Sequence, residues 1–188
     1  MNKSLRSRRL RCRAKLLRAL REFFHERGFV EVETPLLTDE IIPEAHIEPY
    51  CVVDDRSMDD GDARRWLQAS PELHMKRLVS EGFEAIFQVT RSFRRDELGR
   101  LHLPEFTIVE WYRVGDDLAA GMDLLDNLCR QLLQAPAAVR TSYREAFERR
   151  LAVNPHTASA NELAAKAAEF GVAMPEAPAA EAKDEWLN

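Results

Sequence analysis

The amino-acid sequence predicts an α+β fold in which an antiparallel sheet is flanked by helices. Three observations predict it. A long helical pattern is followed by several short alternating segments, with helical patterns placed irregularly between them. The regular alternation of strand and helix that is typical of parallel sheets does not occur. No glycine-rich loop that would cradle a phosphate follows a predicted strand, which argues against dinucleotide-binding and P-loop folds.

The first element expected is a helix over residues 4–27. Its apolar residues recur at helical spacing, and arginines fill the opposite face. Gly28 is a typical residue just past a helix end. Residues 29–34 alternate between apolar and polar, which predicts a half-buried strand that ends at Pro35. Residues 46–53 alternate again and predict a second strand.

The middle of the chain predicts a turn, a strand and a helix. Residues 54–64 form an acidic stretch that we expect to be a turn, and residues 65–69 form a short strand. Ser70 is followed by proline and glutamate, an order typical of a helix start with serine as the N-cap. We expect this helix to run to about residue 80.

Two longer strands follow, over residues 83–93 and 105–114, with a charged loop over residues 95–103 between them. This loop is long for a hairpin, and long charged loops are often functional. An amphipathic helix capped by Asp116 or Asp117 then reaches about residue 134.

The composition changes after residue 135, which predicts a core over residues 1–135 and a second, partial helical region over residues 136–188. Residues 141–151 fit either a strand or a short helix. Residues 161–170 predict an alanine-rich helix that begins near Ser159 or Asn161. Residues 174–182 predict a linker, and the final residues, DEWLN, predict the start of another helix.

Charge and cysteine usage limit the class of protein. The net charge of −5 argues against a general nucleic-acid binder, although residues 1–21 carry nine Lys or Arg and no acidic residue, which indicates a basic arm for an anionic partner. The three scattered cysteines imply neither a disulfide framework nor a metal site. No apolar run approaches the roughly 20 residues that span a membrane, so we expect a cytoplasmic protein.

The strand over residues 105–114 carries unusual side chains on one face. Phe106, Ile108, Glu110 and Tyr112 share that face because alternate residues of a strand point the same way. Arg94 closes the preceding strand, and a guanidinium is a common partner of phosphate. An aromatic ring beside such an arginine predicts a nucleotide site on the sheet. The alternative is a solvated loop with weak surface ion pairs.

Three segments in order resemble the catalytic domain of class II aminoacyl-tRNA synthetases of the lysyl type. Residues 14–35 resemble the family's first motif, a helix and then a strand that ends in proline. FRRD at residues 93–96 with HLPEFT at residues 102–107 resembles its second motif, and ASPELHMKRL at residues 69–78 is similar to the segment that carries a substrate-recognising glutamate. Within this group, the chain is most similar to the elongation factor P–lysine ligase family.

The resemblance implies an ATP site. Arg94 would hold the α-phosphate and act in catalysis, Phe106 would stack on adenine, and His102 would approach the outer phosphates. Asp96 stands where the family has a glutamate that contacts the adenine amino group, and it is one methylene shorter. Leu103 replaces the usual asparagine of the family.

The resemblance also implies an amino-acid site and an acceptor. Glu72 and Glu110 would bind the two amino groups of lysine or (R)-β-lysine, and Tyr112 would line the same pocket. Pro35 would lie at a homodimer interface. The acceptor would be a lysine side chain of elongation factor P, with tRNA the less favoured alternative. His74 and Lys76 are expected to be ordinary residues of a helix surface.

Two further expectations concern activity. The family's third motif and the main Mg²⁺ ligands are expected beyond residue 188, so we expect this chain alone to be inactive in adenylate formation and assign no metal ligand within it. The alternatives to an elongation factor P ligase are part of a lysyl-tRNA synthetase and a degenerate, non-catalytic paralogue that dimerises or binds.

Overall fold

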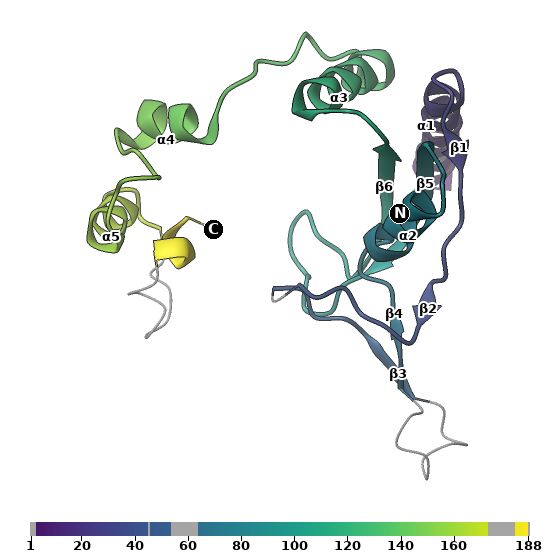
Figure 1. Ribbon diagram of the computed structural model, residues 1–188, viewed down its shortest axis with the longest axis horizontal. Coiled ribbons are helices and arrows are strands. Elements are labelled where there is room, and N and C mark those ends of the chain that lie inside the picture. Colours follow the sequence, from purple (N-terminus) through teal and green to yellow (C-terminus); the bar gives the residue numbers. More distant parts are fainter. Residues whose placement is uncertain (1–2, 45, 54–63, 173–182, 188) are drawn as a thin grey trace. The chain divides into compact units, whose positions relative to one another are not determined.

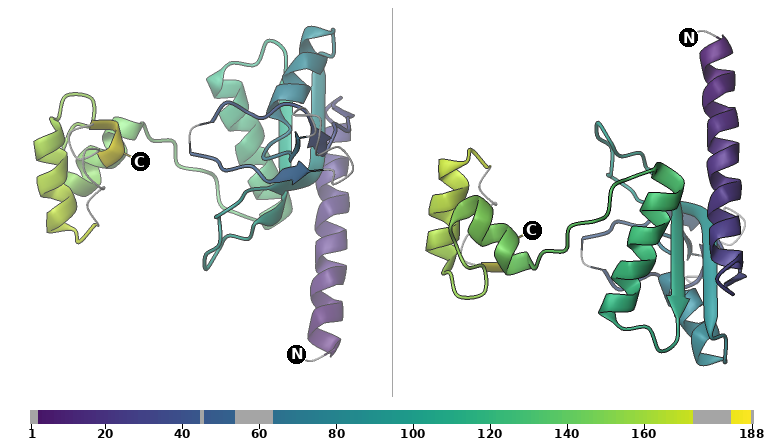
Figure 2. Two further views of the ribbon diagram at one scale, coloured as in Figure 1. Left: turned by 90° about the horizontal axis from the view of Figure 1, so that it is seen from below. Right: turned by 90° about the horizontal axis from the view of Figure 1, so that it is seen from above.

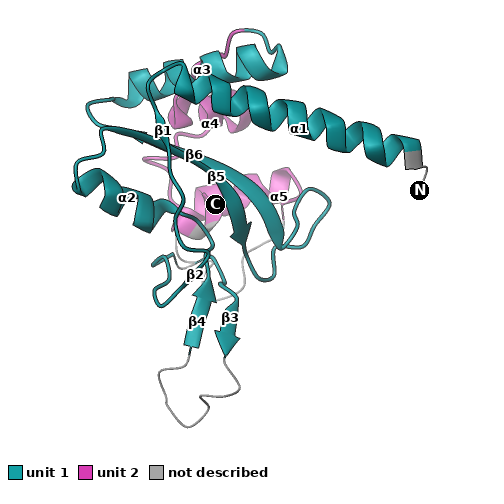
Figure 3. Cartoon of the chain, turned by 90° about the vertical axis from the view of Figure 1, so that its right-hand side faces the viewer, with its two compact units in different colours: residues 1–136 teal, residues 137–188 magenta. Residues whose placement is uncertain are grey.

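The computed structural model describes residues 3–44, 46–53, 64–172 and 183–187. The predicted acidic turn, except Arg64, and the predicted linker at residues 174–182 lie outside these ranges. The chain divides into two compact units, residues 1–136 and 137–188 (Figure 3). Within the ranges described, no helix combines the length and the apolar character that a membrane crossing requires.

The main sheet of the first unit has three strands in the order β1-β5-β6 (Figure 1). These strands are β1 (Val30–Glu31), β5 (Ala85–Phe93) and β6 (Glu105–Arg113). β5 and β6 form the long antiparallel pair that the sequence predicts, whereas β1 runs parallel to β5. In this register Gln88 lies opposite Glu110, and Ser92 lies opposite Phe106.

One face of this sheet carries the hydrophobic core. The helices α1 (Lys3–His25) and α3 (Leu118–Leu133) lie side by side on it (Figure 3). Phe24 of α1 is fully buried and stacks on Phe87 of β5, with ring centroids 4.7 Å apart. The ring centroid of Trp111 in β6 lies 5.3 Å from the ring centroid of Phe24. The core therefore takes the odd-numbered residues of β6, and the even-numbered residues point to the opposite face, as their alternation predicts.

The opposite face meets α2 (Glu72–Ser80), which contacts both β5 and β6. A second, antiparallel sheet leads into this helix, in the order β2-β4-β3. Its strands are β2 (Leu37–Thr38), β3 (Cys51–Val53) and β4 (Arg64–Leu67).

Several predicted boundaries are wrong. The strand expected over residues 29–34 is only β1, because the chain leaves the sheet after the Val32 N–H donates to the Phe87 carbonyl. The strand expected over residues 46–53 is only β3, since Pro49 lacks a ladder donor. β2 has no counterpart among the strands expected from the sequence. Ser70 is not the N-cap of α2, which is Pro71; the Ser70 hydroxyl instead accepts from the Glu72 N–H at 3.2 Å.

Other helix ends follow the expected chemistry. Gly28 has φ of 79°, a left-handed conformation that glycine adopts without strain, and it ends α1. Asp117 caps α3 by accepting from the Ala120 N–H at 2.8 Å. Figure 2 shows the N-terminal half of α1 extending past the sheet, and residues 4–16 are all exposed.

The second unit contains α4 (Tyr143–Leu151), α5 (Ala160–Glu169) and the 3-10 helix η3 (Lys183–Trp186). Residues 141–151 thus adopt the helical alternative, and the end of the chain forms a 3-10 turn rather than the start of an α-helix. Both α4 and α5 begin with a capping box, Ser142 with Glu145 and Ser159 with Glu162.

Candidate functional site

Arg94 lies where the chain leaves β5, and three contacts fix its guanidinium. Its Nε donates to the Ala69 carbonyl at 3.2 Å, and one terminal nitrogen donates to Glu97 Oε1 at 3.3 Å. Its central carbon lies 5.2 Å from the centroid of the Phe106 ring, a cation–π distance. The Arg94 side chain is only 24 % exposed, and these contacts fix the position of its positive charge at the end of the sheet.

A pocket of about 530 Å³ opens beside this arginine. It brings together all four residues predicted for ATP, Arg94, Asp96, His102 and Phe106. The rest of its wall comes from the loop between β5 and β6, namely Glu97, Leu98, Gly99, Leu101 and Leu103. Its volume is within the range of about 300–1,000 Å³ that small-molecule sites have.

The two acidic residues of this loop have different environments. Asp96 adopts a left-handed backbone conformation, φ 63°, which aspartate tolerates better than most residues. Its side chain is 74 % exposed, and its nearest charged partner is Arg95 at 3.7 Å. Glu97, which the sequence did not assign to the site, is the residue that pairs with Arg94. No sequence pattern predicts this contact, because a spacing of three residues brings side chains together in a helix and Glu97 lies in a loop.

The loop is closed near its tip. The Gly99 N–H donates to the His102 carbonyl at 3.1 Å, and the His102 N–H donates to the Gly99 carbonyl at 3.4 Å. The Arg94 N–H donates to the Pro104 carbonyl at 2.9 Å at the loop base. These backbone bonds hold His102 on the pocket wall while its side chain remains exposed.

Glu110 lies on the same face of β6 as Phe106. Both of its carboxylate oxygens accept from hydroxyls: Ser70 donates to Oε2 at 3.0 Å, and Tyr112 donates to Oε1. Neither donor is charged, so these contacts orient the carboxylate without neutralising it. Gln88, opposite Glu110 in the register, is buried and accepts from the Thr34 hydroxyl at 3.1 Å, which supports the floor of the site.

Both carboxylates predicted to bind substrate interact electrostatically with the Tyr112 phenol. Burial raises the pKa of its phenol well above the usual value, and the hydrogen bond to Glu110 raises it further. The negative charges of Glu110 and Glu72 act on this pKa in the same direction. The phenol therefore stays protonated as a donor, and the two carboxylates lie near one ring.

Glu72 is in the first turn of α2, where it pairs with Lys76 one turn later. The Lys76 ammonium also lies 6.0 Å from the centroid of the Tyr112 ring. The sequence predicts an ordinary surface role for Lys76. Lys76 is exposed as predicted, and its ammonium also pairs with one of the carboxylates predicted to bind substrate.

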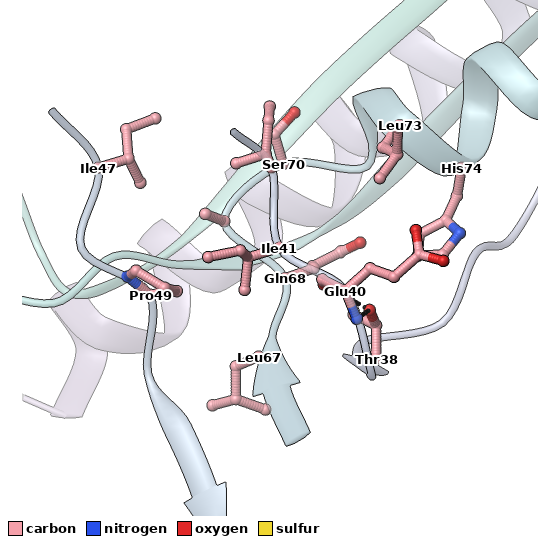
Figure 4. A pocket seen from close by; sticks show the side chains of 12 residues that line it. Thr38, Glu40, Ile41, Ile47, Pro49, Leu67, Gln68, Ser70, Leu73 and His74 are labelled. Atoms are coloured by element: carbon pink, nitrogen blue, oxygen red, sulfur yellow. Dashed lines mark hydrogen bonds between the residues drawn. The ribbon is translucent and has the colours of Figure 1, made fainter. Parts of the chain in front are cut away.

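Ala69 and Ser70 connect the two halves of the site. The carbonyl of Ala69 accepts from Arg94, and the hydroxyl of Ser70 donates to Glu110. Gln68, which is buried, anchors this segment by donating to the Arg91 carbonyl at 2.7 Å. The same segment lines a second, small pocket of about 20 Å³, and Figure 4 shows Gln68 and Ser70 among its lining side chains.

The remaining expectations concern metal and assembly. In the part of the chain that is described, no three His, Cys, Asp or Glu side chains gather where they would hold a metal ion. We therefore assign no described residue as a ligand of the Mg²⁺ that the resemblance implies. Pro35, predicted at a dimer interface, is exposed in the single chain.

Comparison with known protein families adds one finding. A family model described as tRNA synthetases class II (D, K and N) matches residues 1–176. This match spans the loop pocket, the carboxylate pair and most of the second unit.

Proposed function

Because this chain belongs to the class II tRNA synthetase family (D, K and N), we propose that it activates a lysine-type amino acid with ATP and transfers it to elongation factor P. The family implies an ATP-dependent ligase of the aminoacylation type. The proposed amino acid is (R)-β-lysine, and the proposed acceptor is a lysine side chain.

One observation carries the proposal. The charges of two carboxylates, Glu72 and Glu110, both raise the pKa of the Tyr112 phenol. This phenol lies on the sheet face that also bears the ring of Phe106. A substrate with two ammonium groups matches two carboxylates in charge and in hydrogen-bonding capacity. Such a substrate would place its own carboxylate toward Arg94, where a nucleotide phosphate would also lie.

The proposed first step is adenylate formation. An oxygen of the substrate carboxylate attacks the α-phosphorus of ATP, the new P–O bond forms, and pyrophosphate leaves with the electrons of the broken P–O bond. Arg94 would stabilise the charge that develops on the α-phosphate, because its guanidinium is already oriented by Ala69 and Phe106. Phe106 would stack on adenine, and His102 would approach the outer phosphates. Mg²⁺ would neutralise phosphate charge, and its ligands are not assigned among the described residues.

The second step passes the acyl group to an amine. The acceptor nitrogen attacks the adenylate carbonyl, AMP leaves, and the nitrogen loses a proton. The description of the family favours a second candidate, charging of tRNA with lysine, in which the nucleophile is a hydroxyl. Asp96 favours a third, a non-catalytic paralogue, because it stands where the family has a longer glutamate and its side chain is 74 % exposed. A homodimer that uses Pro35 is part of the proposal.

ATP–pyrophosphate exchange by the complete gene product tests these candidates. We expect exchange with (R)-β-lysine and much slower exchange with α-lysine, followed by labelling of elongation factor P. Exchange with α-lysine and labelling of tRNA alone would replace the first candidate with the second. No exchange with either amino acid would leave the non-catalytic paralogue.

A further inference from the structure

Lys76 forms an ion pair with Glu72, one of the two carboxylates proposed to bind the amino-acid substrate. Its ammonium pairs with Glu72 Oε1 and lies 6.0 Å from the Tyr112 ring centroid. Glu110, the other carboxylate, accepts only from neutral hydroxyls in its described hydrogen bonds. The pocket thus holds one carboxylate matched by a cation of the chain itself and one that is not.

An arriving substrate ammonium would compete with this internal cation. A carboxylate binds one ammonium best when no second positive charge lies beside it, because like charges a few ångströms apart repel. The Lys76 side chain is 58 % exposed and its partner lies one turn away in the same helix, so the pair is weak and can open. Lys76 can therefore swing into solvent when a better-placed ammonium arrives.

We propose that Lys76 is a placeholder cation for one amino group of the substrate, and that its displacement from Glu72 sets the affinity for diamino acids. This inference rests on the proposed function, since it takes a lysine-type substrate as the ligand. The placeholder balances the charge of Glu72 and weakens binding of any ligand that must replace it. A ligand without the corresponding amino group leaves the Lys76–Glu72 pair intact.

Calorimetric titration with L-lysine and with (R)-β-lysine tests the placeholder. We expect Lys76→Met to tighten the Kd of the diamino acid about three- to tenfold, because displacement no longer opposes binding and a like charge is gone. Lys76→Arg restores a cation and is expected to return the Kd to near the wild-type value. Arg77→Met is the matched control: it removes a positive charge from the next residue of α2, whose partner is Glu40, and is expected to leave the Kd within about twofold.

Two monoamine analogues separate displacement from a general change in charge. Norleucine lacks the side-chain amine of lysine, and 6-aminohexanoate lacks the α-amine. If Lys76 holds the place of one amino group, one analogue gains affinity in Lys76→Met and the other does not, which also identifies the group that reaches Glu72. An equal gain for both analogues, or an equal gain in Arg77→Met, would overturn the placeholder.

The outcomes keep the two proposals apart. If wild-type protein binds a diamino acid and Lys76→Met binds it equally well, the placeholder fails and the proposed substrate class stands. If neither wild-type protein nor Lys76→Met binds either diamino acid, the proposed substrate class fails, and the placeholder fails with it. Circular dichroism of each variant checks that α2 remains folded.

Discussion

The guanidinium carbon of Arg94 lies 5.2 Å from the centroid of the Phe106 ring, across the end of the β5–β6 hairpin. Both side chains line one pocket, and the contact holds a flat cation against a flat aromatic surface. A nucleotide has the matching chemistry, since its base stacks on rings and its phosphates bind guanidinium groups.

Replacing Arg94 with alanine is expected to weaken ATP binding about 10- to 100-fold, because a charge-assisted contact to phosphate is lost. Arg95→Ala provides the control: Arg95 is adjacent in sequence, is 61 % exposed, and does not line the pocket. Calorimetry with ATP checks both variants. Equal losses in the two would show that a general reduction in positive charge, and not the position of Arg94, determines the affinity.

Glu110→Gln keeps the shape of the side chain and removes its charge. We expect binding of a diamino acid to weaken about 10- to 100-fold, since a hydrogen bond to a charged group becomes a neutral one. The comparison is Glu105→Gln on the same strand, where the carboxylate is exposed and pairs with Arg91. Ligand titration monitored by nuclear magnetic resonance measures both, and an unaltered Kd in Glu110→Gln would remove Glu110 from the amino-acid site.

The raised pKa of Tyr112 predicts a pH dependence at the alkaline end. The unfolded chain releases this proton near pH 10, about the usual tyrosine value, whereas the folded chain retains it. Its contribution to stability is therefore complete below about pH 10 and declines as the pH rises further. Phenolate absorbance is expected to show a late ionisation, and Tyr112→Phe should abolish that late phase. An unchanged titration curve in the variant would contradict the shift.

Phe24 is expected to be the most sensitive core position tested by truncation. It is fully buried and contacts the rings of Phe23, Phe29, Phe87 and Trp111. Phe24→Ala should lower the free energy of unfolding by about 3–5 kcal/mol. Leu10→Ala, in the same helix but 57 % exposed, should change it by less than about 0.5 kcal/mol. Urea denaturation compares the two, and similar losses would place the core elsewhere.

The capping box of α4 predicts an acid transition. The Ser142 backbone N–H, and then its hydroxyl, hold the pKa of the Glu145 carboxyl below its usual value. The stabilisation is present above the usual carboxyl pKa and is lost as the pH falls through the lowered one. The Ser142 amide resonance should report that transition, and Glu145→Gln, which keeps an acceptor, should not show it. A midpoint at the ordinary carboxyl pKa would argue against the cap.

Long elements were predictable from the sequence because their patterns repeat. The helical spacing of α1 and the alternation along β6 each extend over many residues, so the existence of both elements and the two faces of β6 could be predicted. The two-residue strands β1 and β2 were not predictable in the same way. Their length depends on where the partner strands β5 and β4 stop offering hydrogen bonds.

The site was predictable in its residue types but not in its internal contacts. The residues expected at the nucleotide pocket are gathered there, although their roles remain predictions. Glu97 and Lys76 were not assigned, because the conformation of a loop determines the first contact and the packing of α2 against β6 determines the second. The sequence predicts a helix cap at Ser70, and only the tertiary structure places its hydroxyl on Glu110.

The Ala69–Ser70 peptide has a thermodynamic consequence. Arg94 donates to the carbonyl of the first residue and Glu110 accepts from the hydroxyl of the second, so a displacement of the backbone at both residues would alter both contacts. A ligand that prefers one orientation of the peptide also selects the geometry available to a ligand at the other end. If two ligands are coupled through this segment, reciprocity requires each to change the affinity for the other by the same factor.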